Sequence, residues 1–221
     1  MISNYKKYKH ISFDLWLTLI KSNVNYKPKR DKLFKDFFEI NFSIDKVSET
    51  IRRYDLICNT INETTGKNLE TNEIYLLILG SLGVDLNKIN AKELEEFYIE
   101  TEQLFFKYKP NLIYSDINHF LRKLKDEHIS TNVLSNTAFI KGKTLNKLLK
   151  HYELIEYFSF TIYSDEYGIS KPNNKIYELL HQRINEIKVI AKNEVLHVGD
   201  NPIADYKGAI DYGFDAILIN K

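Results

Sequence analysis

The sequence lacks the features that mark secreted or membrane proteins. Cys58 is its only cysteine, which excludes an internal disulfide and fits a reducing compartment. No apolar run approaches the roughly 20 residues that a membrane-spanning helix needs. The first apolar run, residues 13–20, is interrupted by Asp14, so it is no signal-peptide core. We therefore expect a cytoplasmic protein without a membrane partner.

A large excess of charge is also missing. The 31 basic and 30 acidic residues leave a formal net charge of +1, which gives no global field for attracting nucleic acid. There is no internal repeat and no low-complexity tract. With 43% hydrophobic and 28% charged residues, the composition is that of an ordinary globular protein. A chain of 221 residues is long enough for one domain with a large insertion.

What the sequence does contain is a set of short apolar runs with the character of β-strands. Each run is apolar at consecutive positions, as expected for strands that are covered by helices on both faces. Helical patterns lie between the later runs, and this alternation predicts a parallel sheet with crossover helices. The predicted strands are residues 10–15, 131–135, 158–163, 194–199 and 215–220, and the helices are residues 115–127, 144–152, 173–185 and 203–212. We predict a doubly wound, Rossmann-like α/β core.

The first two predicted strands are more than a hundred residues apart, far too many for a single crossover. The intervening segment has helical spacing throughout, with helices expected at residues 30–40, 43–60, 71–82 and 91–107. The simplest account is an all-helical cap domain, residues 22–108, inserted into the α/β core. The core would then be discontinuous, comprising residues 1–21 and 109–221.

Polar residues with chemical potential follow four of the predicted strands. The carboxyl ends of parallel strands meet at one edge of a sheet, so these side chains are expected to share one crevice. They are Asp14 and Thr18 after the first strand, Ser135 and Asn136 at the end of the second, Lys171 after the third, and Asp200 and Asp205 after the fourth.

These residue types suit phosphoryl transfer. A carboxylate attacks a phosphate dianion only if their charge repulsion is cancelled. Mg²⁺ held by Asp14, Asp200 and Asp205 would cancel it, and Lys171 would add positive charge. The Ser135 hydroxyl and neighbouring backbone N–H groups would hold the remaining phosphate oxygens. Three clustered acids without a cation would repel one another, which favours a metal site.

In order and spacing the chain resembles the haloacid dehalogenase (HAD) superfamily over its whole length. The matching elements are Phe13-Asp14-x-x-x-Thr18, then Ser135, then Lys171, then Gly199-Asp200 with Asp205. The helical insertion is similar to the cap that many members carry after the first strand. The resemblance implies that most activities of this fold pass through an aspartate.

The resemblance also implies a role for each residue. Asp14 is the nucleophile and, like Asp200 and Asp205, belongs to the Mg²⁺ site. The backbone carbonyl of Trp16 is a further ligand. Lys171 and Ser135 act in catalysis, and they bind the substrate phosphate together with Thr18 and Asn136. The expected path is an aspartyl-phosphate on Asp14, followed by attack of water.

Trp16 is where the sequence departs from the family pattern. Phosphatases of the family have a second aspartate there, which protonates the leaving oxygen and later activates water. Such general acid–base catalysis contributes about 10²–10⁴-fold. The indole N–H of tryptophan only donates a hydrogen bond, so it supplies no exchangeable proton.

Several functions are compatible with this substitution. A Mg²⁺-dependent phosphatase acting on a small phosphorylated metabolite would take its acid–base help from the cap, from water or from the substrate. A metal-independent 2-haloacid dehalogenase needs no second acid, although it has no use for Asp200. A third possibility is a catalytically weak or inactive protein that only binds phosphate or metal. C–P cleavage would need a cap lysine for a Schiff base, and none can be singled out. We predict the phosphatase.

Two further features of the sequence lie close to the candidate site residues. Lys27, Lys29 and Arg30 follow the first strand, where they would be either a solvated linker or a contact to an anionic part of the substrate. His197 lies inside the fourth strand and is expected to be a buried, hydrogen-bonded core residue.

Overall fold

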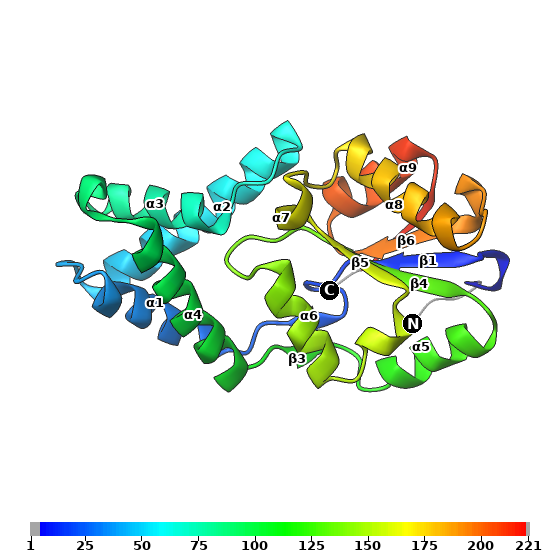
Figure 1. The fold of residues 1–221 in the computed structure, drawn as a ribbon, viewed down its shortest axis with the longest axis horizontal. Coiled ribbons are helices and arrows are strands. Elements are labelled where there is room, and N and C mark those ends of the chain that lie inside the picture. The colour runs from blue at the N-terminus through cyan, green and yellow to red at the C-terminus, as the bar shows by residue number, and fades with distance from the viewer. Residues whose placement is uncertain (1–4, 220–221) are drawn as a thin grey trace.

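A computed structural model describes residues 5–219 and has a five-stranded parallel sheet at its centre. The order of the strands is β5-β4-β1-β6-β7 (Figure 1). Their bounds are β1 (His10–Phe13), β4 (Ser130–Ser135), β5 (Phe160–Tyr163), β6 (Val195–Gly199) and β7 (Asp215–Leu218). Each predicted strand is present, and Asn220, the predicted end of the last one, lies outside the described residues.

The central strand β1 is paired on both sides by strands that are distant in sequence. His10 is in register with Ser130 of β4 on one side and with Val195 of β6 on the other. All residues of β1 and β6 are buried, which explains why their sequences are apolar at consecutive positions. The chain runs from β1 to β4 and β5 in one direction and continues with β6 and β7 in the other. The crevice between β1 and β6 is therefore the topological switch point, where sheets of this kind bind ligands.

Helices cover both faces of the sheet. In Figure 1, α8 and α9 lie on one face, while α5 and α6 lie on the other. Their bounds are α5 (Ile117–Asp126), α6 (Gly142–His151), α8 (Asn174–Ile187) and α9 (Gly208–Tyr212), with a short α7 (Ser164–Tyr167) after β5. The predicted helix 203–212 is divided, since a π-helical segment η5 (Pro202–Lys207) precedes α9. The doubly wound α/β fold is confirmed.

Four α-helices lie between residues 22 and 110, as predicted: α1 (Tyr26–Phe37), α2 (Ile44–Thr65), α3 (Thr71–Ser81) and α4 (Ala91–Lys107). They pack around their own apolar cluster, which includes Phe34, Ile51, Ile78 and Phe97. The predicted start of the first helix at residue 30 was wrong by about one turn. Pro28 lies in the first turn of the observed helix, which tolerates proline because its N–H needs no partner there. The exact division into core and cap stays a prediction.

A small antiparallel pair links the two places where the chain enters and leaves the helical segment. It consists of β2 (Ile20–Lys21) and β3 (Asn111–Leu112), and it was not predicted because two residues carry no readable periodicity. The pair holds the two crossings side by side at the base of the helices.

The C-terminal end of α2 rests on the α/β part of the molecule. Gly66 ends the helix, and its carbonyl accepts hydrogen bonds from Ser170 N (3.1 Å) and Asn173 Nδ2 (3.2 Å). Three residues earlier, Glu63 Oε1 accepts a hydrogen bond from Asn201 Nδ2 at 2.5 Å. These contacts place the end of α2 beside the carboxyl edge of the sheet. Within residues 5–219, no helix has the length and apolar character required to cross a membrane.

Candidate active site

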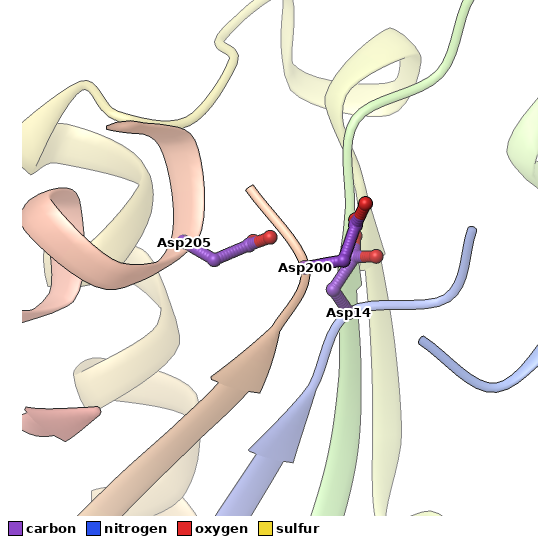
Figure 2. Close-up of side chains that lie close together, drawn as sticks. All are labelled: Asp14, Asp200 and Asp205. Carbon is purple, nitrogen blue, oxygen red and sulfur yellow. The ribbon is translucent and has the colours of Figure 1, made fainter. Parts of the chain in front are cut away.

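Three aspartates meet at the carboxyl edge of the sheet, beside the β1–β6 crevice. Figure 2 shows Asp14 at the end of β1, Asp200 at the end of β6, and Asp205 pointing toward both from the helical segment that follows β6. One carboxylate oxygen from each lies within 4.8 Å of the others. Asp14 and Asp205 are buried, at 6% and 2% exposure, so their charges need partners inside the protein.

Lys171 provides the cationic partner. Its Nζ donates hydrogen bonds to Asp14 Oδ1 (2.8 Å), to Asp205 Oδ1 (2.5 Å) and to the carbonyl of Leu134 (2.8 Å). An ammonium group has three N–H donors, and each therefore has a partner. Since Lys171 is 1% exposed, the ion pairs are shielded from solvent.

Asn136 fixes the backbone of Lys171. Its Oδ1 accepts from the Lys171 N–H at 2.8 Å, and its Nδ2 donates to the Lys171 carbonyl at 3.0 Å. The Ser135 hydroxyl donates to the Asn136 carbonyl at 3.3 Å, and Ser135 is buried. The structure thus shows Asn136 positioning the lysine, while the phosphate contacts of Ser135 and Asn136 stay predictions.

Asp205 is held by the loop after β6 as well as by Lys171. Its Oδ2 accepts from the Asn201 N–H (2.9 Å), and its Oδ1 contacts Nε2 of the buried His197 (3.1 Å). Gly199 makes this approach possible, because a Cβ there would lie 2.2 Å from the Asp205 carboxyl group. Glycine is therefore required before Asp200 for a steric reason, because the edge of the sheet must come close to the helical segment that carries Asp205.

Thr18 orients the candidate nucleophile. Its hydroxyl donates to Asp14 Oδ2 at 3.1 Å, and both residues are buried. The Asp14 N–H donates to the Val198 carbonyl of β6 at 2.8 Å. A tight turn, in which Leu17 has φ +58°, brings Thr18 back over Asp14. Both oxygens of Asp14 thus have defined directions before a ligand enters.

The charges of the two buried acids differ. Burial, together with repulsion by Asp205 and Asp200, raises the pKa of Asp14 to about 7, although Lys171 opposes this shift. Burial acts against ionisation of Asp205 too, but Lys171 and the hydrogen bond from His197 outweigh it and hold its pKa below the usual range. The pKa of Lys171 is raised, because attraction to both acids exceeds the cost of burial. Asp205 therefore stays ionised at neutral pH, whereas Asp14 gains or loses its proton near pH 7.

The carboxylates fit a Mg²⁺ site. Magnesium prefers oxygen ligands at about 2.0–2.1 Å in an octahedron, which places ligand oxygens about 3–4 Å apart. The separation of up to 4.8 Å among the three acids is close to that spacing. Asp205 accepts three hydrogen bonds, from Lys171, His197 and Asn201, whereas Asp14 accepts two, one on each oxygen, from Lys171 and Thr18. Asp14 therefore keeps more acceptor capacity than Asp205 for a direct contact to the ion. Asp14 and Asp200, which line the same cavity, are the better suited pair, and ligation by any of the three acids or by the Trp16 carbonyl stays a prediction.

A cavity of about 320 Å³ opens over these residues. Its lining includes Asp14, Lys171 and Asp200 from the α/β part and Glu63 from α2, with Trp16 as an apolar wall. The Trp16 ring packs edge-on against Phe105 of α4, with ring centroids 6.4 Å apart. A larger groove of about 550 Å³, lined by Lys9 and Ser130 among others, lies at the opposite edge of the sheet and contains none of the three acids.

Several lining residues come from the helical segment and were not singled out as site residues from the sequence. They are Asn59, Asn62 and Glu63 of α2, which lie among many similar polar residues on that helix. Only the packing of α2 against the core selects the face that meets the site. Of the cations considered earlier, Lys27 and Arg30 line a neighbouring cavity, whereas Lys29 is exposed and lines neither.

Sequence comparison finds curated relatives that include a haloacid dehalogenase and a protein named for its rhythmic expression. The chain is 25% identical over 135 residues to (S)-2-haloacid dehalogenase 2 of a Pseudomonas species, covering 61% of this chain and 54% of that protein. It is 29% identical over 100 residues to the rhythmically expressed gene 2 protein of Drosophila melanogaster, covering 45% and 36% respectively. The aligned segments thus span about half or less of these curated relatives.

Solved structures share the fold. The HAD-hydrolase YfnB of Bacillus subtilis, solved with bound magnesium, matches with a TM-score of 0.70 at 17% identity, covering 96% of this chain and 89% of that one. A HAD phosphatase of Thermococcus onnurineus matches with a TM-score of 0.61 at 20% identity, covering 96% and 86%. A 2-haloacid dehalogenase of Pseudomonas syringae pv. Tomato matches with a TM-score of 0.63 at 17% identity, also covering 96% and 86%.

A family model matches most of this chain. The model for haloacid dehalogenase-like hydrolases matches residues 8–213, which include both halves of the α/β part and the helical insertion. The first strand, the buried Asp14–Lys171 pair and the Gly199-Asp200 loop all lie within the matched range. The chain belongs to the haloacid dehalogenase-like hydrolase family.

Proposed function

We propose that this protein is a Mg²⁺-dependent phosphohydrolase that acts on a small phosphorylated metabolite, with Asp14 as the nucleophile. The observation that carries the proposal is the grouping of Asp14, Asp200 and Asp205 around Lys171 at the end of β1 and β6. A hydrolase that needs no metal has little reason to gather three acids, since their mutual repulsion disfavours ionisation of the nucleophile.

Each residue has a separate role in the proposed reaction. A carboxylate oxygen of Asp14 attacks phosphorus, the bond to the leaving oxygen breaks, and an aspartyl-phosphate forms. Lys171 compensates the charge of Asp14 and stays beside it through the step, and Thr18 keeps the carboxylate oriented. Mg²⁺, when bound by Asp14 and Asp200, supplies positive charge that cancels repulsion between nucleophile and substrate. Water then attacks phosphorus and frees Asp14.

The proton for the leaving oxygen needs a source other than Trp16. Glu63 is a carboxylic acid from α2 that lines the same cavity as Asp14. Its Oε1 accepts from Asn201 Nδ2, and the Asn201 oxygen accepts from the N–H groups of Ile203 (2.8 Å) and Ala204 (2.9 Å), which fixes the orientation of the amide. In our proposal Glu63 gives its proton to the leaving oxygen and then takes one from the attacking water.

A direct assay tests the phosphohydrolase proposal. We expect phosphate release from p-nitrophenyl phosphate with Mg²⁺, none with EDTA, and none in the Asp14→Asn variant. Trp16→Asp is expected to raise the turnover, because it adds an acid beside the nucleophile. Undiminished activity in Asp14→Asn would reject the nucleophile.

Haloacid hydrolysis is the second candidate, and two observations favour it. Trp16 removes the acid that dehalogenation does not need, and the sequence is similar to that of an (S)-2-haloacid dehalogenase. Asp14 would displace halide from carbon and form an ester, which water then hydrolyses. Halide release from a 2-haloacid in the presence of EDTA would establish this activity. If neither substrate class is turned over while Mg²⁺ or phosphate still binds, the protein is a binding protein.

A further inference from the structure

A second cavity, of about 310 Å³, adjoins the one that contains Asp14. The two cavities share four lining residues, so they lie side by side with Trp16 in the lining of both. The shared residues are Trp16, Leu17, Asn59 and Asn136. The second cavity lies between α1, α2 and the loop that follows β4, at the side away from Asp200 and Asp205.

The charge of the second cavity contrasts with that of the first. Its lining contains three cations, Lys27, Arg30 and Arg52, and one acid, Asp55. The lining of the first cavity is dominated instead by acids, with Asp14, Asp200, Asp205 and Glu63 facing one lysine. The cations reach the second cavity because residues three or four apart share a helix face: Lys27 and Arg30 on α1, and Arg52 and Asp55 on α2.

Arg30 is the anchor of this cationic wall. It is 8% exposed, and its guanidinium lies over the Phe139 ring at 4.7 Å. Its Nε and Nη2 donate to a single oxygen, Asp31 Oδ1, at 3.0 and 2.8 Å. These bonds use one side of the guanidinium, so the Nη1 group stays outside them. A buried, oriented guanidinium is well suited to binding an anionic oxygen.

Lys27 and Arg52 extend the wall toward solvent. Arg52 Nη1 donates to Asp55 Oδ2 at 3.0 Å, but the Arg52 side chain is 60% exposed, so this pair holds the arginine only weakly. Phe139 and Ile140 add apolar surface to the lining that contains the cations and Trp16. The cavity thus offers both positive charge and apolar contact, next to the cavity that contains Asp14.

We propose that this second cavity binds an anionic group of the substrate, which makes the substrate a small phosphate ester that carries a carboxylate or a second phosphate at its other end. The inference rests on the proposed function, because it places the scissile phosphate beside Asp14. The anionic end lies against Lys27, Arg30 and Arg52, and the linking carbon atoms pass Trp16. The cations thus select which ester is bound and leave the bond cleavage to Asp14.

Matched esters and matched variants test the proposal. The substrates are propyl phosphate, its counterpart with a terminal carboxylate, and 1,3-propanediol bisphosphate. We expect kcat/KM for at least one of the two anionic esters to exceed that for propyl phosphate by about tenfold or more. Arg52→Gln and Lys27→Gln are expected to raise KM for the preferred ester by a much larger factor than KM for propyl phosphate, which has no second anionic group for these cations to bind.

The chain provides its own controls. Arg53 and Lys29 are neighbours of the same charge that are exposed and line neither cavity, so Arg53→Gln and Lys29→Gln should preserve the preference. The relative rates with the carboxylate and the bisphosphate tell which anion is preferred. Equal kcat/KM for all three esters, or equal effects of Arg52→Gln and Arg53→Gln, would overturn the inference while the phosphohydrolase stands.

Binding separates failure of the inference from failure of the proposed function. In the Asp14→Asn protein, calorimetry with the three esters should show tighter binding of an anionic ester, and the added Arg52→Gln change should abolish the difference. If wild type cleaves no ester but this difference is found, the phosphohydrolase fails and the anion site stands. If no difference is found, the anion site is rejected.

Discussion

At the scale of single residues, Lys171 compensates the negative charges of the site. It lies between Asp14 and Asp205 with almost no solvent contact, so the two acids depend on it for compensation. Removal of one partner from a buried ion pair costs far more than loss of an exposed pair, because the remaining charge stays buried. The site therefore contributes to the stability of the fold as well as to the proposed chemistry.

Replacement of this lysine should reveal that contribution. We expect Lys171→Met to lower the free energy of unfolding by about 3–5 kcal/mol in EDTA, measured by urea denaturation. The added Asp205→Asn change should recover part of the loss, because it removes one of the two uncompensated charges. Lys175→Met, at an exposed position of α8, is the control and should cost little. A loss equal to that of the control would contradict the charge balance.

The pKa of Asp14 predicts a pH dependence with a definite sign. Its value of about 7 lies above the ordinary 3.8, so the folded metal-free protein binds this proton more tightly than the unfolded chain. The stabilising contribution of the proton is complete at low pH and is lost as the pH rises to about 7. Asp14→Asn lacks this loss, so its stability relative to wild type in EDTA should be greater at pH 8 than at pH 5. A pH-independent difference would contradict it.

Glu63 gives a test that depends on the leaving group. A proton donor matters most when the leaving alkoxide is poor, so Glu63→Gln should lower kcat/KM for alkyl phosphates by about 10²-fold and barely affect kcat/KM for p-nitrophenyl phosphate. The ratio kcat/KM reports the step in which the leaving group departs, whereas loss of the base would lower kcat for both substrates. Glu49→Gln changes an exposed acid elsewhere on α2, paired with Lys46, and should leave both substrates unaffected. Equal losses of kcat/KM with both substrates would contradict the role of Glu63 as the proton donor.

At the scale of elements, the C-terminal end of α2 determines which helical residues meet the site. Gly66 has φ +68°, and a Cβ there would lie 2.6 Å from Asn173 Nδ2. We expect Gly66→Ala to destabilise the protein by more than Gly83→Ala. Gly83 also has a left-handed φ, +74°, but has open space around it, so its alanine variant should cost only the backbone term of about 1–2 kcal/mol. Thermal unfolding measures both, and equal losses would exclude a steric contribution at Gly66.

The elements also show how far the sequence alone was informative. The strands were predictable because their apolar runs need cover on both faces, and the strand-end rule brought Asp14, Asp200 and Lys171 to one edge. The face of α2 that carries Glu63 was not predictable, because it depends on how the helical cluster packs against the α/β core. The use of Asn136 for the Lys171 backbone was hidden too, since it follows from the course of two loops.

At the scale of the whole molecule, metal binding should be visible as stability. A ligand that binds only the folded state at 100 times its Kd adds about 2.7 kcal/mol, which corresponds to roughly 5–10 °C in Tm for a domain of this size. We expect Mg²⁺ to raise the Tm of wild type by an amount of this order and to have little effect on Asp200→Asn. Asp211→Asn, which changes an exposed acid of α9, should respond like wild type. An equal response of Asp200→Asn would exclude that residue from the metal site.

The position of Lys171 has a consequence for how the protein reaches its native state. Its ammonium joins Asp14 after β1, Leu134 in β4 and Asp205 after β6, and Asp14 is 157 positions away along the chain. Such contacts form only when strands distant in sequence have found their places, and contacts over long separations slow folding. During refolding, helical signal should return before the site does. Formation of the Lys171–Asp14 ion pair would therefore report when β1 has taken its place between β4 and β6.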